Sequence, residues 1–400
     1  MQRITVVGIG ADGWDGLAME SRRLVREAEV VMGDKRHLDS VPWSWWQARV
    51  EWPWPVEEAL PGLLEEHDGK RIVVLAAGDP LVAGIATPLV NLVGADDVDV
   101  IPTVSSESLA RARMRWSFDE TSLVSLHGRD VRRLLPHLAP GRKLIVLSSD
   151  GGTPASVAAL LVTQGYGETA MTVLSDLGGL AESRTEATAA AWRDRVSAEV
   201  NVICLECVAD GSRRSAMSSV PGLPEAAFGS EIAPIGRDAR AAALSRLAPA
   251  GGDLLWALGA GAASVAIEWL RSEPLAAAVV VVGADEAVAV KESAADLGVP
   301  ELRIVEGAAP AALDGLDAPD AVFVGGGAAD APILDAVRSA VRPGGRLVVQ
   351  AASLDEEAAL LELFRAHDGE LVRIGVEEVL PADSLAWTPR RAVVQWSLVR

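Results

Sequence analysis

The chain of 400 residues has only two cysteines, and both lie in one short stretch, NVICLECVA. The CxxC spacing of Cys204 and Cys207 is compatible with a redox pair or with half of a zinc site. A structural zinc site needs four ligands, however, and a redox pair normally opens a helix. The surrounding residues are apolar and β-branched, which is typical of a strand, so the two side chains would point to opposite faces. We therefore expect two buried structural cysteines and no metal.

Positive charge is also scarce, because 36 lysines and arginines stand against 56 acidic residues and give a net charge of −20. This balance disfavours a general nucleic-acid or anionic-membrane surface. No uncharged apolar run reaches the ~18 residues needed to cross a membrane. The first residues, MQRITVVGIGADGW, lack a secretory pattern. We expect a cytoplasmic protein without nucleic-acid or membrane partners, in which local basic clusters meet any anionic ligand.

The length exceeds what one hydrophobic core usually supports, so two domains are expected. Strands alternate with helical patterns throughout, which predicts the α/β class. Residues 210–234 fall in a stretch rich in Ser, Gly and Pro and are predicted to link a first domain, 1–209, to a second, 235–400. In the first domain the clearest strands are 3–10, 71–80, 98–102, 143–150 and 201–208, with helices near 17–28, 105–115, 130–138 and 154–164. The second domain is predicted to contain strands at 253–258, 278–283, 302–305, 320–324, 345–350, 370–377 and 392–399, and helices at 237–247, 262–271, 285–296, 329–341 and 353–367.

Two glycine loops follow strands in the first domain. The stretch GIGADG at 8–13 has the GxGxxG spacing, which alone is compatible with a dinucleotide fold whose ribose acceptor is Asp34, or with a turn that binds nothing. The second loop, LAAGDPLVAGIA at 75–86, places Gly78-Asp79-Pro80 at the end of another strand. A dinucleotide fold does not require this second loop, so a nicotinamide dehydrogenase is disfavoured.

With both loops, residues 1–209 resemble the tetrapyrrole methylase family. The motifs VVGIGADGW, MGDKRHL, AAGDP followed by GIA, IPTVSSESLA, VSLHGRD, SSDGGTPASVAALL and LECVA resemble the branch that methylates precorrins in cobalamin synthesis. The resemblance implies two small α/β subdomains with a cleft that holds S-adenosylmethionine, mainly by backbone groups. The cofactor-binding residues that it implies are Gly8, Gly10, Gly78, Asp79, Pro80, Ser105 and Ser106. Asp79 could equally be a turn residue, and Val82 and Ala83 replace the aromatic residues expected after the loop.

Precorrins carry many carboxylates, so the resemblance also implies cationic side chains near the cleft. The candidates are Arg111, Arg113 and Arg115 in RARMRW, and His127 with Arg129 in SLHGRD. A guanidinium can bind a carboxylate in a bidentate contact, and Arg113 and Arg129 are the two predicted substrate contacts. The first three arginines could also be ordinary exposed helix residues.

Two further residues are candidates for moving protons during the reaction. Asp12 follows the first glycine loop, and His127 lies at a strand end, so both are expected to be catalytic; a turn-capping role is the alternative for Asp12. His37 is either a substrate contact or part of a helix start. His67, His137 and His367 have no ligand-spaced partners in the sequence and are expected to be surface or packing residues.

The second half contains the stretches PGLPEAAFGSE, GRDARAAALSRLAPAGGDLLWALGAG, DAVFVGGG, PGGRLVVQAASLDEEAALL and VVQWSLVR. With these stretches it resembles the C-terminal domain of precorrin-6Y methyltransferases. The resemblance implies a Rossmann-like methyltransferase domain that methylates carbon 15 and decarboxylates an acetate side chain, while the first domain methylates carbon 5. Cofactor contacts are expected from Gly259, Gly261 and Ser264.

Several positions of this second domain depart from the family pattern. An acid and a third loop glycine are expected where Ala257 and Ala263 stand, and the ribose acceptor falls on Val281 or Val282. Further departures are Ala308, Ile235-Gly236 and Gln350. Loss of a charged hydrogen bond of about 1.5 to 3 kcal/mol weakens binding roughly tenfold to a hundredfold, and a Cβ at 263 would add crowding. One hypothesis is therefore an impaired domain that serves as a scaffold, oligomerisation surface or tetrapyrrole holder. The other is that the remaining backbone donors suffice and that Asp285 or Glu286 reaches the ribose.

Taken together, these features predict methyl transfer from S-adenosylmethionine to a nucleophilic ring carbon, with catalysis mostly by alignment. The expected partners are a precorrin substrate and further copies of the chain in a homo-oligomer. The alternative from another class is a non-catalytic tetrapyrrole-binding or scaffold protein, which the intact GDP, Ser-Ser and HGR segments disfavour.

Overall fold

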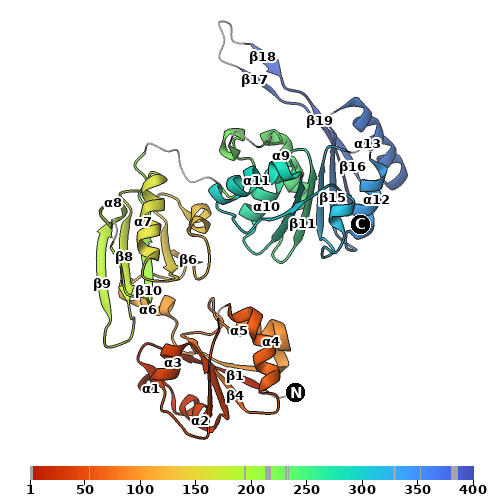
Figure 1. The fold of residues 1–400 in the computed structure, drawn as a ribbon. Helices are drawn as coiled ribbons and strands as arrows, with labels where there is room; N and C mark the ends of the chain where they lie inside the picture. The colour runs from red at the N-terminus through yellow and green to blue at the C-terminus, as the bar shows by residue number, and fades with distance from the viewer. Residues whose placement is uncertain are drawn as a thin grey trace. The chain divides into compact units, whose positions relative to one another are not determined.

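The computed structural model describes residues 3–53, 55–192, 195–211, 218–229, 232, 234–327, 330–351, 353–379 and 386–400. The chain divides into two compact units, one of Met1–Val131 with His137–Ser215 and one of Arg132–Pro136 with Ala216–Arg400. Part of the predicted linker, 212–217, 230, 231 and 233, lies outside the described residues. The predicted α/β class is confirmed in both units (Figure 1).

The first sheet of the first unit is wholly parallel, in the order β3-β2-β4-β1-β5. Its strands are β1 (Ile4–Ile9), β2 (Val30–Gly33), β3 (Ala48–Glu51), β4 (Ile72–Ala77) and β5 (Val98–Ile101). The helices around it are α1 (Gly13–Gly16), α2 (Met19–Glu27), α3 (Lys35–Ser40), α4 (Val56–Glu66), α5 (Ala86–Val93) and the 3₁₀ turn η1 (Ala95–Asp97). Side chains on both faces of β1 and β4 belong to apolar clusters, which explains their nearly continuous hydrophobic sequences. Because β4, β1 and β5 are parallel neighbours, their carboxyl ends meet at one edge.

The second sheet of this unit is mixed, in the order β6-β7-β10-β8-β9. Its strands are β6 (Thr121–Ser125), β7 (Lys143–Leu147), β8 (Ala170–Ser175), β9 (Ser183–Thr188) and β10 (Asn201–Glu206). Helices α6 (Ser106–Met114), α7 (Thr153–Thr163) and α8 (Ala189–Trp192) accompany it. The helix predicted near 130–138 is instead a 3₁₀ helix, η2 (Val131–His137), and it contains Pro136, which lacks the N–H that a regular α-helix needs.

Both cysteines are buried and free, as predicted, but only Cys204 lies within β10, since the strand ends one residue before Cys207. Burial raises the pKa of the Cys204 thiol to about 12 and that of Cys207 to about 11. Neither thiol is therefore ionised near neutral pH.

The second unit is built on a seven-stranded sheet in the order β13-β12-β11-β14-β15-β19-β16. Its strands are β11 (Leu254–Gly259), β12 (Ala277–Val282), β13 (Arg303–Glu306), β14 (Ala321–Gly325), β15 (Arg346–Ala351), β16 (Glu370–Ile374) and β19 (Val393–Val399). The helical elements are α9 (Arg237–Leu247), α10 (Ala262–Ser272), α11 (Ala284–Asp296), α12 (Ala331–Ala340), α13 (Leu354–His367) and the 3₁₀ turns η3 (Glu225–Phe228) and η4 (Ala311–Leu313). Strand β19 is antiparallel to β15 and β16, so the strands predicted at 370–377 and 392–399 pair with each other. The strand predicted at 370–377 ends at Ile374, and an unpredicted ribbon of β17 (Glu377–Val379) and β18 (Trp387–Pro389) follows.

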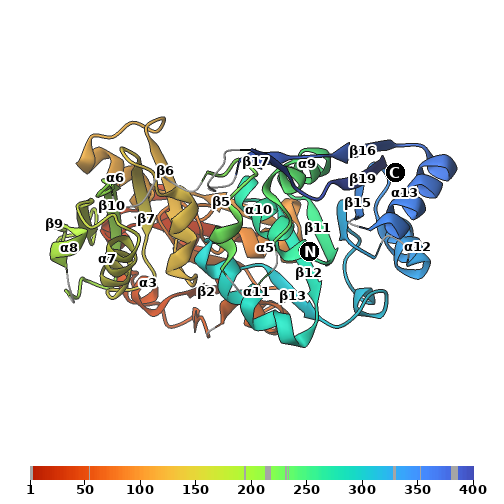
Figure 2. The ribbon, with the colours of Figure 1, turned by 90° about the horizontal axis from the view of Figure 1, so that it is seen from above.

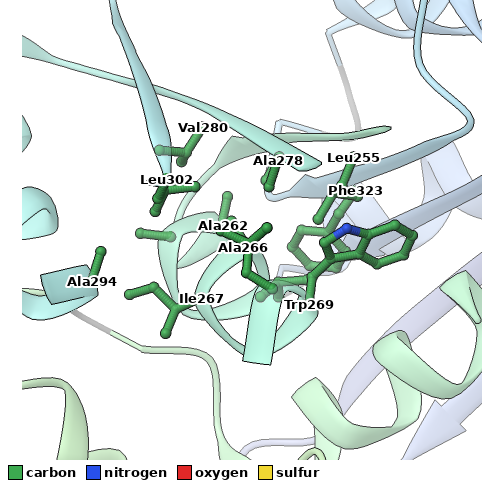
Figure 3. Close-up of a cluster of buried hydrophobic side chains, with 14 of the residues drawn as sticks. Leu255, Ala262, Ala266, Ile267, Trp269, Ala278, Val280, Ala294, Leu302 and Phe323 are labelled. Atoms are coloured by element: carbon green, nitrogen blue, oxygen red, sulfur yellow. The ribbon is translucent and has the colours of Figure 1, made fainter. Parts of the chain in front are cut away.

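Two apolar clusters cover the faces of this sheet. Helices α9, α10 and α11 pack on one face and α12 and α13 on the other (Figure 2). Trp269 of α10 lies in the first cluster with Leu255 and Phe323 of the central strands (Figure 3). The order of strands reverses between β11 and β14, and ligands of open α/β sheets bind at the carboxyl edge beside such a reversal. No helix in the described ranges is both long and apolar enough to cross a membrane.

Candidate functional site

In the first unit, the two predicted glycine loops meet at the carboxyl edge of the parallel sheet. The Gly78 amide donates to the Ile9 carbonyl at 3.0 Å, and the Thr103 amide donates to the Gly78 carbonyl at 3.2 Å. A Cβ added at Gly8 would lie 2.0 Å from the Gly78 oxygen and 2.7 Å from the Thr103 nitrogen. Only glycine therefore permits this approach of β1, β4 and β5 at residue 8.

The Gly78-Asp79-Pro80 loop is fixed by its own hydrogen bonds. Asp79 Oδ1 accepts the Leu81 amide at 2.9 Å, and the Pro80 carbonyl accepts the Ala86 amide at 3.2 Å. Gly78 has a φ of +56°, and a Cβ there would lie 3.0 Å from Ser105 Cα. Asp79 thus acts as a turn residue in this structure, and the loop presents backbone groups rather than the carboxylate.

Ser105 and Ser106 complete this loop cluster, which lies at the carboxyl ends of β1, β4 and β5. Ser105 is the N-cap of α6, and its buried hydroxyl accepts the Ser108 amide at 3.1 Å. Ser106 begins the helix, with its nitrogen 3.5 Å from a Cβ placed at Gly78. The Ser105 side chain is therefore committed to the helix cap, and the helix start brings backbone amides to the cluster.

Asp12 is exposed beside the first loop. It occupies the N-cap position of the short helix α1, but its side chain makes no capping hydrogen bond. Its carboxylate lies against Gly10 and Gly16, because a Cβ at Gly10 would be 2.6 Å from Asp12 Oδ1 and one at Gly16 would be 2.0 Å from Oδ2. The structure therefore supports neither a turn cap nor burial for Asp12.

The second sheet contacts this cluster through the loop between β8 and β9, which sequence reasoning missed. A Cβ at Gly179 would lie 3.1 Å from Ala11 Cβ in the first loop, and one at Gly178 would lie 3.4 Å from Leu109 of α6. The only sequence signal was the glycine pair in LSDLGG.

Arg113 is held by this same loop. Its guanidinium pairs with the Glu182 carboxylate through both oxygens, with 2.8 Å from Nη2 to Oε2, and Glu182 also accepts the Gly178 amide at 2.8 Å. The hydrogen bond from Arg113, and then the one from the Gly178 amide, lower the pKa of Glu182 to about 2. Arg113 was predicted to bind substrate, but in this structure its guanidinium is paired with Glu182. The side chain therefore joins α6 to the β8–β9 loop. Neighbouring Arg111 pairs with Glu107 and stacks on Phe118.

His127 and Arg129 are exposed on the turn that follows β6. Gly128 has a φ of +64°, and its amide donates to Ser149 Oγ at the end of β7 at 2.9 Å. The Arg129 amide donates to the Leu126 carbonyl at 3.0 Å. Both side chains thus lie at the edge of the second sheet where the parallel strands β6 and β7 end.

A cavity of about 500 Å³ lies beside the β8–β9 loop. Its wall contains Ser175 at the end of β8, Ser183 at the start of β9, Trp192 and residues 195–198. The Arg195 guanidinium lies 5.8 Å from the Trp192 ring centroid. This volume is within the usual range for a small-molecule pocket.

His37 is buried in α3, with Nδ1 3.7 Å from Asp34 Oδ2. Burial, and then the charge of Arg36, lowers the pKa of His37 to about 4. The imidazole is therefore neutral at physiological pH. His67 is also buried, with Nδ1 3.5 Å from Lys70 Nζ, which fits the predicted packing role.

In the second unit, the loop after β11 has the backbone of a nucleotide-binding turn. Gly259 and Gly261 have φ values of +80° and +71°, and Gly261 is the N-cap of α10. A Cβ at Gly259 would lie 2.6 Å from the Gly325 oxygen at the end of β14. The two loops beside the strand reversal therefore pack backbone to backbone, as a site held by backbone groups requires.

The Ser264 side chain lies inside the protein in the first turn of α10. It is fully buried, its hydroxyl donates to the Gly261 carbonyl at 2.7 Å, and the Ile235 amide donates to it at 3.2 Å. The Ser264 hydroxyl therefore joins the segment before α9 to the glycine loop.

Two of the departures from the family pattern are also buried. Ala257 is fully buried and Ala263 is 7% exposed, and both belong to the apolar cluster under α10. The methyl group of Ala263 thus packs into the core.

The comparisons with known proteins agree with this architecture. Residues 3–191 match the family of tetrapyrrole (corrin/porphyrin) methylases, and residues 227–400 match the precorrin methyltransferase domain. The fold and the two family matches thus define an S-adenosylmethionine-dependent methyltransferase in which a tetrapyrrole methylase domain is followed by a precorrin methyltransferase domain.

The precorrin-6Y C(5,15)-methyltransferase (decarboxylating) of Sinorhizobium sp is 38% identical over 396 residues, which cover 98% of this chain and 95% of that protein. The cobalt-precorrin-7 C(5)-methyltransferase of Salmonella typhimurium is 32% identical over 174 residues, or 44% of this chain and 85% of that protein. Among solved structures, the C-terminal domain of the Rhodobacter capsulatus precorrin-6Y C5,15-methyltransferase is 37% identical, covers 46% of this chain and all of that one, and has a TM-score of 0.43. The chain belongs to the precorrin-6Y C(5,15)-methyltransferase family.

Proposed function

We propose that the chain methylates a precorrin in cobalamin biosynthesis with S-adenosylmethionine as donor. The first domain, 1–209, methylates carbon 5, and the second, 235–400, methylates carbon 15 and removes the carboxyl group of an acetate side chain. The observation that carries the proposal is the convergence of Gly8, Gly78 and Ser105 at one sheet edge. The full-length relative is named for both carbons, and a relative named for carbon 5 alone aligns with less than half of this chain, which supports two separable activities.

When bound, the sulfonium supplies an electrophilic methyl group. The chain has to hold the donor and the macrocycle in line and keep water out, and alignment of this kind accounts for much of such catalysis. Backbone groups at Gly8, Gly10, Gly78 and Pro80 and the start of α6 would hold the donor, with Asp79 fixing the turn.

On the substrate side, Arg129 is the proposed carboxylate contact of the first domain. Asp12 and His127 are the proposed proton-handling groups, and the exposure of all three side chains fits contact with a ligand. In the second domain, Gly259 and Gly261 would hold the donor through their backbone.

We also propose a homo-oligomer. The support is the ribbon of β17 and β18, which carries an exposed tryptophan, Trp387, at 71% exposure. Exposed aromatic residues of this kind are enriched in protein interfaces. Light scattering of the purified chain would give the mass, and Trp387→Ser should lower it.

The proposed activity is tested by incubating the full chain with a metal-free precorrin and S-adenosylmethionine. Mass spectrometry would count the methyl groups gained, and gas analysis the carbon dioxide released. We expect two methyl groups and one carbon dioxide per substrate. One methyl group without carbon dioxide would restrict the activity to the first domain, and no transfer at all would contradict the proposal.

A further inference from the structure

The second domain has no acidic residue at the place where nucleotide-binding folds usually have one. In such folds, an Asp or Glu about 20 residues after the glycine loop, at the end of the second strand, accepts the ribose hydroxyls. Here the second strand, β12, ends at Val282, which is 7% exposed and packs in the apolar cluster under α10. The side chain at this position therefore cannot supply the acceptor.

A carboxylate from the next helix nevertheless lies beside the end of β12. Helix α11 begins at Ala284 with Gly283 as its N-cap, and Asp285 lies in its first turn. A Cβ added at Gly283 would be 2.6 Å from Asp285 Oδ1. The Asp285 side chain therefore folds back over the Cα of Gly283, into the space that any other residue would fill.

This carboxylate is on the same edge as the glycine loop. Leu258 pairs with Val281 in parallel register, so Gly259 and Val282 end their strands side by side. Asp285 is exposed, and within the described ranges no protein group binds its carboxylate. It comes about 25 residues after the loop, close to the spacing that the ribose acceptor has in general.

We infer that Asp285 is the ribose acceptor of the second cofactor site, and that Gly283 is the residue that gives its carboxylate room. This inference rests on the proposed function of the second domain. It explains how that domain can bind S-adenosylmethionine although β12 ends in valine, and it leaves Ala257 and Ala263 as packing residues.

Two other acids lie nearby and define the alternatives. Glu286 follows Asp285 in the same turn, and Glu306 at the end of β13 is the register partner of Val282. Asp285 is preferred because its Oδ1 lies 2.6 Å from the position that a Cβ at Gly283 would take, whereas neither Glu286 nor Glu306 has an atom among those nearest to that position.

The test is equilibrium dialysis of the full chain with radiolabelled S-adenosylmethionine, which gives stoichiometry and Kd without any substrate. We expect the unmodified chain to bind two equivalents. Asp285→Ala should leave one site unchanged and weaken the other about 10- to 100-fold, as loss of a charged hydrogen bond would. Gly283→Ala should weaken the same site by displacing the carboxylate. Glu292→Ala, an exposed acid two turns along α11, is the matched control and should bind as the unmodified chain does.

The outcomes separate the inference from the proposed function. Binding of one equivalent by the unmodified chain, or of two by Asp285→Ala with unchanged affinities, would overturn the role of Asp285 while the first site stands. A loss seen with Glu286→Ala or Glu306→Ala instead of Asp285→Ala would also overturn it. No binding at all would contradict the proposed function itself.

Discussion

Replacement of Gly8 by alanine should disable methylation of carbon 5 by the first domain and spare methylation of carbon 15 by the second domain. The added Cβ would lie 2.0 Å from the Gly78 oxygen, whereas ordinary contacts begin near 3.4 Å, so the two backbones would have to separate by about 1.4 Å. Overpacking of this kind costs about 1 to 3 kcal/mol of stability. A shift of about 1 Å in a positioning element can slow catalysis roughly a hundredfold. We therefore expect methylation of carbon 5 to fall about a hundredfold.

The assay is the methyl count described above, resolved by product. Gly8→Ala should accumulate substrate methylated once, at carbon 15, provided that the second domain accepts it. The control is Gly62→Ala, because a Cβ at Gly62, inside α4, meets no atom within 4 Å. Alanine is the better helix former by about 1 kcal/mol, so this variant should be at least as stable and fully active. Normal methylation of carbon 5 by Gly8→Ala would refute the convergence of the two loops as the basis of the site.

Three further predictions concern stability and reactivity. Burial lowers the pKa of His37 to about 4 in the folded chain, whereas the unfolded chain has an ordinary histidine pKa of about 6.5. Between these two pH values only the unfolded chain binds the proton. The free energy of unfolding should therefore fall by up to roughly 3 kcal/mol as the pH drops from about 6.5 toward 4. Urea unfolding of His37→Gln at pH 7 and 5 should show a smaller pH dependence, and an unchanged slope would contradict this. Glu268→Ala leaves the buried Arg240 without its ion-pair partner and should lower the free energy of unfolding by about 3 to 5 kcal/mol. Glu370→Ala, which breaks an exposed ion pair, should lower it by less than about 1 kcal/mol in the same urea assay. Equal losses for the two variants would be inconsistent with the burial of the first pair. Cys204, whose thiol pKa is raised to about 12, should resist iodoacetamide at pH 8 until the chain is unfolded, and rapid labelling of the native protein would contradict its burial.

The longer buried strands and the glycine loops were predictable because each rests on local sequence, whereas β2, β3, β6, β8 and β9 were not among the predicted strands. β-Branched runs such as residues 72–77 and 277–282 have few alternatives to a buried parallel strand, and glycine directly after a strand indicates a close backbone approach. The family resemblance correctly assigned both halves of the chain.

The direction of individual side chains was not predictable in this way. Ser264 follows a glycine loop, as a ligand-binding serine would, but the first turn of α10 points its hydroxyl inward to Gly261 and Ile235. Arg113 meets Glu182, a residue 69 positions away, through a loop between antiparallel strands that sequence reasoning had not identified. Pairings of this kind depend on how the sheets pack rather than on any local pattern.

A crystal structure of the full chain with S-adenosylhomocysteine would show whether the first glycine loops form the cofactor site. We expect electron density for the ligand in the first unit, against the backbone of residues 78–80 and the start of α6. Density for the ligand only elsewhere in that unit, or side chains filling the space beside Gly78, would contradict this expectation.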